Sequence, residues 1–152
     1  MAIARGAGTE IVRTAMFEDV VGTTNAKLII GVQHHIYTIL SVVLYANAVN
    51  TAGTDYVALS VKGYDSYGGT SAQNMYFLQW KPSPQETFVW NDKFSFNGTE
   101  PTDFSATLGT DATKQDAIAD QATTTSQDLE IYVSHASTQI DVYVTFIDQN
   151  NA

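Results

Sequence analysis

The chain has 152 residues and a mass of 16.5 kDa, which suits a single domain that buries roughly 68–70% of its unfolded surface without metals or disulfides. It has no cysteine, which excludes disulfides, thiolate catalysis and cysteine-ligated zinc. The net charge is −9, and residues 86–152 hold eleven acidic residues against only Lys93 and Lys114. Nucleic acid and anionic membranes both require clustered Lys and Arg, so this charge disfavours them as partners.

The N-terminal third predicts strands around one long central element. Residues 1–9 are small and glycine-containing, and we expect them to form an extended N-terminal arm without a secretory signal. Strands are predicted over residues 10–17 and 27–32, with an acidic turn over residues 18–26. The longest strand is predicted over residues 34–49, where both alternating faces are largely apolar. We therefore expect it at the centre of a sheet, covered on both sides for part of its length.

The middle of the chain predicts shorter strands, over residues 55–64, 74–80, 86–90 and 93–96. A polar, glycine-rich connection is expected over residues 64–73. Pro82 and Pro84 end the strand before them, because proline cannot donate to a sheet ladder.

The C-terminal third begins with a polar stretch, residues 99–127, in which residues 111–121 favour a short surface helix capped by Thr110 or Asp111. Residues 128–135 and 138–148 alternate cleanly between apolar and polar side chains, and we predict that they pair as a hairpin. The whole pattern predicts an all-β fold: a single-domain antiparallel sandwich or jelly-roll barrel over residues 1–152, with one short surface helix.

No recognised constellation of catalytic residues is present, so the sequence predicts that the protein is not an enzyme and needs no cofactor. The G-x-S-x-G, H-E-x-x-H and P-loop motifs are absent. His34 and His35 are adjacent and would point to opposite faces of a strand, and His135 adds no third ligand at a metal-site spacing. Asp65–Gly69 resembles a calcium loop in composition only and is expected to be a turn. We therefore predict no metal site.

Aromatic residues are concentrated between residues 76 and 96, which indicates a core or a subunit interface, where such side chains are enriched. The candidate interface residues are these aromatics together with two from the arm: Ile3, Arg5, Tyr76, Phe77, Trp80, Phe88, Trp90, Phe94 and Phe96. If the aromatics from Phe88 to Phe96 were exposed instead, they could stack on sugar rings, as in a carbohydrate-binding β-sandwich module.

Three segments, Gly31–Thr38, Glu86–Phe96 and Phe146–Asn151, resemble small structural proteins in the virions of tailed bacteriophages, particularly marine and cyanobacterial phages. The resemblance implies a capsid decoration (cement) protein, a class often built as β-sandwich or jelly-roll trimers without catalytic residues. The implied partners are further copies of the chain, as a homotrimer, and the major capsid protein. The implied location is the capsid exterior after synthesis in the host cytoplasm. A tail, neck or fibre component with adaptor or receptor-binding duty is the alternative within the virion.

Overall fold

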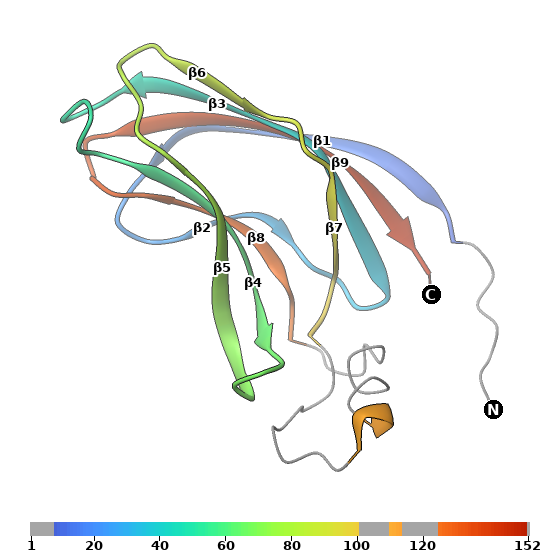
Figure 1. Ribbon diagram of the computed structural model, residues 1–152. Coiled ribbons are helices and arrows are strands. Elements are labelled where there is room, and N and C mark those ends of the chain that lie inside the picture. The colour runs from blue at the N-terminus through green and yellow to red at the C-terminus, as the bar shows by residue number, and fades with distance from the viewer. Residues whose placement is uncertain (1–7, 101–109, 114–124, 152) are drawn as a thin grey trace.

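A computed structural model describes residues 8–100, 110–113 and 125–151 of the chain. Nine strands form in these residues: β1 (Glu10–Val21), β2 (Ala26–Ile30), β3 (His35–Ala48), β4 (Val57–Asp65), β5 (Thr70–Trp80), β6 (Thr87–Trp90), β7 (Phe94–Asn97), β8 (Asp128–Val133) and β9 (Gln139–Asn150). They lie in two layers (Figure 1). Sheet A has the order β1-β9-β3-β6, with β7 also paired to β3, and sheet B has the order β2-β8-β4-β5. Every pairing is antiparallel, so the predicted all-β sandwich is confirmed.

The connectivity is that of a jelly roll. β6 and β7 pair with two successive stretches of β3, Val42–Tyr45 and Ile36–Ile39, and together fill one strand position. The hydrogen-bonded partners then follow a single long hairpin: β4 with β5, β3 with β6 and β7, β2 with β8, and β1 with β9. Rolling up this hairpin brings β9 beside β3 and β8 beside β4, which closes both sheets.

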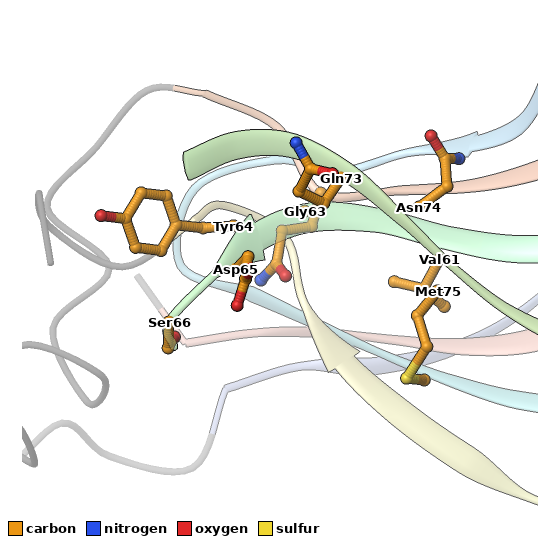
Figure 2. A pocket seen from close by; sticks show the side chains of 9 residues that line it. Val61, Gly63, Tyr64, Asp65, Ser66, Gln73, Asn74 and Met75 are labelled. Atoms are coloured by element: carbon orange, nitrogen blue, oxygen red, sulfur yellow. The ribbon is translucent and has the colours of Figure 1, made fainter. Parts of the chain in front are cut away.

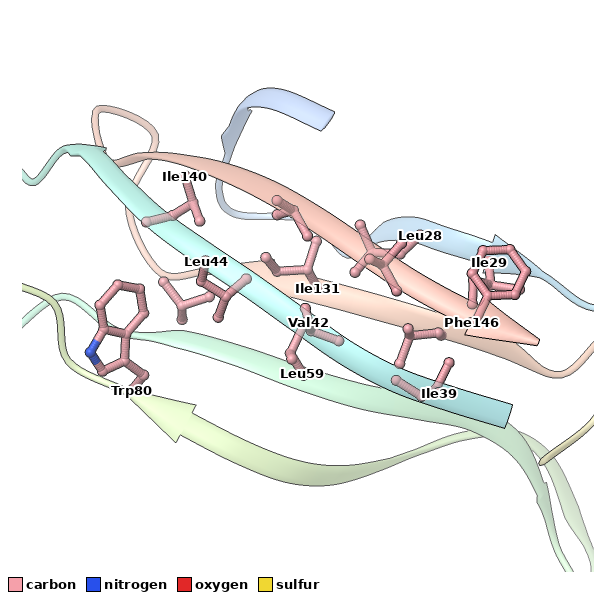
Figure 3. Packing of buried hydrophobic residues seen from close by; sticks show 14 of the residues in the cluster. Leu28, Ile29, Ile39, Val42, Leu44, Leu59, Trp80, Ile131, Ile140 and Phe146 are labelled. Carbon is pink, nitrogen blue, oxygen red and sulfur yellow. The ribbon is translucent and has the colours of Figure 1, made fainter. Parts of the chain in front are cut away.

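The core lies between the sheets and is built mainly from alternate residues of the interior strands, with Leu28 and Ile29 of β2 and Trp80 of β5 added at the edges (Figure 3). From sheet A, Val42 and Leu44 of β3 and Ile140 of β9 are fully buried, and from sheet B so are Leu59 and Ile131. The alternation predicted for residues 55–64, 128–135 and 138–148 is therefore confirmed on the apolar side.

A β-bulge explains why the sequence of β3 looks apolar on two faces. Its pairing with β9 shifts between Ile39 and Ser41, so Leu40 is an extra residue in the ladder. Because of this shift, Tyr37 and Ile39 point into the core before the bulge, and Val42 and Leu44 do so after it. The prediction of a central strand is confirmed. Within the chain the core covers the inward face, whose phase changes at the bulge, and a cover on the outward face stays a prediction.

Three predicted connections are wrong. β8 and β9 do not pair as a hairpin, because β8 lies in sheet B and β9 in sheet A. The expected turn at residues 18–26 begins only after Val21, since a bulge between Phe17 and Val20 lets β1 continue past Asp19, which has a φ of 52°. The expected polar connection over residues 64–73 is mostly strand, because β4 and β5 form a hairpin closed at Asp65 and Thr70.

The predicted helix is described only at its first turn. Residues 111–113 are helical, and the Thr113 backbone N–H donates to Thr110 Oγ1 at 3.3 Å, which confirms Thr110 as the N-cap. Residues 114–121 of this prediction, and residues 1–7 of the predicted arm, lie outside the described residues. At the end of the arm, Thr9 accepts a hydrogen bond from the backbone of Asn150 at 3.0 Å.

Candidate functional site

The outer face of sheet A carries an uncharged surface. The strand register places outward side chains in rows across the sheet, and the three middle rows contain no Asp, Glu, Lys or Arg. The surface, called the uncharged face below, consists of Val12, Thr14, Met16, Thr38, Ser41, Val43, Val89, Ser95, Tyr143, Thr145 and Ile147. Acidic side chains are placed only in the rows at its ends, with Glu10 at one end and Asp141 at the other.

Large apolar side chains of the uncharged face are open to solvent. Met16 is 66% exposed, Val12 64%, Val89 52% and Tyr143 43%. The remaining polar members are neutral hydroxyls, two of which, Thr38 Oγ1 and Ser95 Oγ, lie 2.8 Å apart. Such a face can bury apolar area against a partner without desolvating an ion.

The outer face of sheet B is different, because it holds a buried carboxylate. Glu130 points away from the core yet is only 2% exposed. Its Oε2 accepts hydrogen bonds from Asn25 Nδ2 at 2.8 Å and from Asn74 Nδ2 at 2.9 Å, while Lys62 Nζ lies 4.0 Å from Oε1. The turn before β2 and the strands β4 and β5 therefore supply the partners that a buried carboxylate requires.

A second buried acid, Asp128, lies on the same face of β8. Its Oδ2 lies 2.7 Å from Lys27 Nζ, and its Oδ1 accepts from the Gly31 backbone N–H at 3.2 Å. The hydrogen bond to Asp128, followed by the charge of that carboxylate, raises the pKa of Lys27. Both acids of β8 are thus bonded to groups of their own sheet.

Beside this network, three tyrosines surround a hollow of about 350 Å³ on sheet B, called the tyrosine hollow below. It is lined by Tyr56, Ala58, Tyr76, Gln79 and Tyr132. Ala58 of β4 forms its floor, because it pairs with Tyr132 of β8 on one side and with Gln79 of β5 on the other. Tyr132 alternates with the buried Ile131 and Val133 along β8, and Tyr56 directly precedes the buried Val57, so both rings turn outward. Tyr76 pairs with Ser60, which lies on the same outer face as Ala58.

A larger hollow, of about 560 Å³, lies beside the turn end of the β4–β5 hairpin. Figure 2 shows the side chains that line it. Val61 and Met75, which pair across the two strands, lie side by side on one flank. Both hydrogens of the Gln127 amide there are used, since Nε2 donates to the carbonyls of Asn97 and Thr99. The nearby segment Asp65–Gly69 forms the expected turn, with Asp65 Oδ1 accepting from the Tyr67 N–H at 2.9 Å.

The adjacent histidines do not come together. His34, with a φ of 66°, lies just before β3, and His35 is the first residue of the strand. His35 Nδ1 lies 2.6 Å from Asp148 Oδ1, and Arg13 Nε donates to Asp148 Oδ2 at 2.9 Å. Burial, followed by the Asp148 carboxylate, raises the pKa of the neighbouring Tyr37. This cluster ties the end of β9 to β1 and β3.

Most of the predicted interface residues that the structure describes pack inside the molecule. Trp80 and Phe96 are buried, and Phe77, Phe88, Trp90 and Phe94 pack against the core. Phe77 contacts Trp90 and Phe94 at ring-centroid distances of 5.2 and 4.8 Å, joining β5 to β6 and β7 between the sheets. Trp80 and Phe96 therefore belong to the core, and the interface prediction is wrong for these two. Phe88, Trp90 and Phe94 are partly buried, and the carbohydrate alternative for these aromatics stays a prediction. Tyr76, at 55% exposure, remains on the surface, and Ile3 and Arg5 lie outside the described residues.

Sequence reasoning did not single out the tyrosine hollow. Alternation placed Tyr56 and Tyr132 on outward faces, but a sequence pattern does not say that β4 and β8 are neighbours. Within the described ranges, no group of three or more His, Asp or Glu residues is placed to hold a metal ion. Over the same residues, no helix has the length and hydropathy to cross a membrane.

Comparison with known proteins identifies no family for this chain. No protein-family model matches it, and no curated protein matches it. A solved chain from a structure described as "Bacillus endospore appendages form a novel family of disulfide-linked pili" is 13% identical, with a TM-score of 0.42. The match covers 100% of this chain and 97% of that chain, and a likeness this weak carries no functional argument.

Proposed function

We propose that the protein is a structural subunit of a phage virion, a capsid decoration protein whose copies associate as a homotrimer and bridge major capsid subunits by non-covalent contacts. The uncharged face is the observation that carries the proposal. The proposal assigns the protein no catalytic role and places it on the capsid exterior. The sequence resemblance to phage structural proteins supplies the virion context.

The size of the uncharged face suits a subunit contact. Strand positions about 4.8 Å apart and rows about 6.8 Å apart give four positions (β6 and β7 share one) and three rows an area of roughly 400 Å². A stable interface buries about 800 Å² per partner, with an apolar centre and a polar rim. The uncharged face can supply such a centre, and the polar ends of the strands can supply the rim.

Charge supports the same conclusion. Lys, Arg, Asp and Glu make up 15% of the chain, and the net charge is −9, yet none of these residues lies in the three middle rows of sheet A. An acidic exterior keeps copies soluble and apart, so a neutral surface is where close contact costs least. The chain therefore combines a repelling exterior with one face suited to packing.

The experiment that tests the virion role is quantitative mass spectrometry of purified particles, combined with light scattering of the isolated protein. We expect a fixed, high ratio to the major capsid protein and a solution mass of three chains. A few copies per particle would indicate the tail, neck or fibre alternative instead. Absence from the particle, or a single-chain mass at micromolar concentration, would contradict the proposal.

A further inference from the structure

We propose that the tyrosine hollow on sheet B binds a neutral sugar residue of an oligosaccharide. The inference does not depend on the proposed virion role. The hollow and the uncharged face lie on opposite outer surfaces of the sandwich, so binding and self-association can be altered separately.

The rings form one broad surface. Tyr56 and Tyr132 contact each other with centroids 5.8 Å apart and planes tilted by 40°, and Tyr76 stands on the other side of Ala58, on β5. Aromatic faces carry negative quadrupole charge and attract the weakly positive C–H groups that line one side of a pyranose ring. The small side chain of Ala58 leaves room for a ring to reach the tyrosines.

Polar groups at the rim remain available to a ligand. Within the described part of the chain, no hydrogen bond engages the hydroxyls of Tyr56, Tyr76 and Tyr132 or the amide of Gln79. Hydroxyls and amides both donate and accept, which matches the mixed hydroxyl pattern of a sugar. One row further along β5, Asn74 donates through Nδ2 to both Ser60 Oγ and Glu130 Oε2, which leaves its Oδ1 as an acceptor.

The site is built on rigid elements. β4 and β8 are interior strands of sheet B, and Ala58 is only 4% exposed beneath the rings. The volume of about 350 Å³ lies at the small end of the range for ligand sites, which suits one or two sugar rings. A preformed surface of this kind loses little conformational entropy on binding.

Charge and ring geometry favour a neutral sugar over a cation. No Asp, Glu, Lys or Arg lines the hollow, and the nearby Glu130 carboxylate is occupied by Asn25 and Asn74. A quaternary ammonium ion is held by rings that enclose it. Here two of the three rings pack on each other and form a platform instead.

Saturation-transfer NMR on the full chain tests the inference, with neutral oligosaccharides of glucose, galactose, mannose and N-acetylglucosamine as probes. We expect transfer to the ring protons of at least one probe, with a dissociation constant below about 10 mM. Tyr76→Ala should weaken this binding at least about fivefold, and Gln79→Ala should weaken it as well. Tyr67→Ala is the matched control, because Tyr67 is 94% exposed and lies outside the hollow, and it should bind as the parent does.

Tetramethylammonium and a hexaproline peptide complete the probe set. The inference is overturned if no neutral sugar shows transfer, if only tetramethylammonium or hexaproline does, or if sugar binding is unchanged in both Tyr76→Ala and Gln79→Ala. Circular dichroism of each variant separates loss of binding from loss of fold. Failure to bind sugar would say nothing about the ratio of this protein to the major capsid protein in particles. It would therefore leave the proposed virion role unaffected.

Discussion

Glu130 is an outward-facing carboxylate that the fold nevertheless buries. Strand alternation correctly places it on the side of β8 opposite Leu129 and Ile131, and sequence reasoning alone would make it a solvated surface charge. Its partners Asn25 and Asn74 are 105 and 56 residues away along the chain, so no local sequence pattern predicts these hydrogen bonds. Buried polar networks of this kind depend on strand order, which is why the outer face of sheet B could not be predicted.

Asp55 joins two corners of the sandwich. Its Oδ2 accepts from Thr138 Oγ1 at 2.6 Å, just before β9, and from the Thr51 backbone N–H at 3.1 Å, in the loop after β3. The hydrogen bond from the Thr138 hydroxyl is the main cause that lowers the pKa of Asp55 below its ordinary value of 3.8. The ionised form is therefore favoured in the folded chain.

A lowered carboxylate pKa contributes stability above the unfolded value, and that contribution is lost as the pH falls through the folded value. We expect Asp55→Asn to lower the melting temperature at pH 7. The difference from the parent should shrink below about pH 4. Melting curves between pH 7 and pH 2.5 measure this, with the exposed Asp92→Asn as control. A difference that stays constant over the whole range would contradict this role for Asp55.

At the scale of the strands, β3 shows which features the periodicity of a sequence predicts and which it does not. Its length, its interior position and its apolar content were predictable from residues 34–49. The bulge at Leu40 was not, because an extra residue in a strand leaves no mark in composition. The same limit applies to β8 and β9: two clean alternating patterns joined by a short connection indicate a hairpin, whereas here the connection crosses from one sheet to the other.

Deleting Leu40 tests the bulge directly. On either side of it, Ile39 pairs with Phe146 and Ser41 with Thr145, so removing Leu40 leaves a regular ladder with the same inward residues. We expect this deletion to cost at most about 2 kcal/mol of unfolding free energy. Deleting Val43 instead turns Leu44, which is fully buried, toward solvent, and should cost at least about 3 kcal/mol. Urea denaturation measures the unfolding free energy of both variants. Equal losses in the two would contradict the assignment of Leu40 as the bulged residue.

At the scale of the whole molecule, net charge and the all-β pattern could be read from composition, but the surfaces could not. The prediction that aromatics mark an interface failed for Trp80 and Phe96, because both are used in the core. Trp80 of β5 packs on Phe88 of β6 and so joins the two sheets, and Phe96 of β7 stacks on Tyr37 of β3 within sheet A. The uncharged face is instead made of Val, Thr, Ser and single larger residues scattered over five strands. Only the register brings them together.

Met16 and Met75 allow a matched test of the uncharged face. Both are 66% exposed, but Met16 lies on the uncharged face of sheet A and Met75 on β5 of sheet B. We expect Met16→Lys to weaken self-association at least about tenfold, because an ammonium group would have to be desolvated in the contact. Met75→Lys should associate like the parent. Sedimentation equilibrium gives both constants, and equal behaviour of the two variants would remove the uncharged face as the contact surface.

The jelly-roll connectivity also determines when the protein can fold during synthesis. Of the nine strands described, β8 and β9 leave the ribosome after all the others, yet β9 separates β1 from β3 and β8 separates β2 from β4. Until they emerge, each sheet lacks an inner member, and β1 must wait for a distant partner: Glu10 pairs with Gln149, 139 residues downstream. The nascent chain therefore spends most of its translation with unpaired strand edges, and a chaperone that shields them would act before β9 emerges rather than after release.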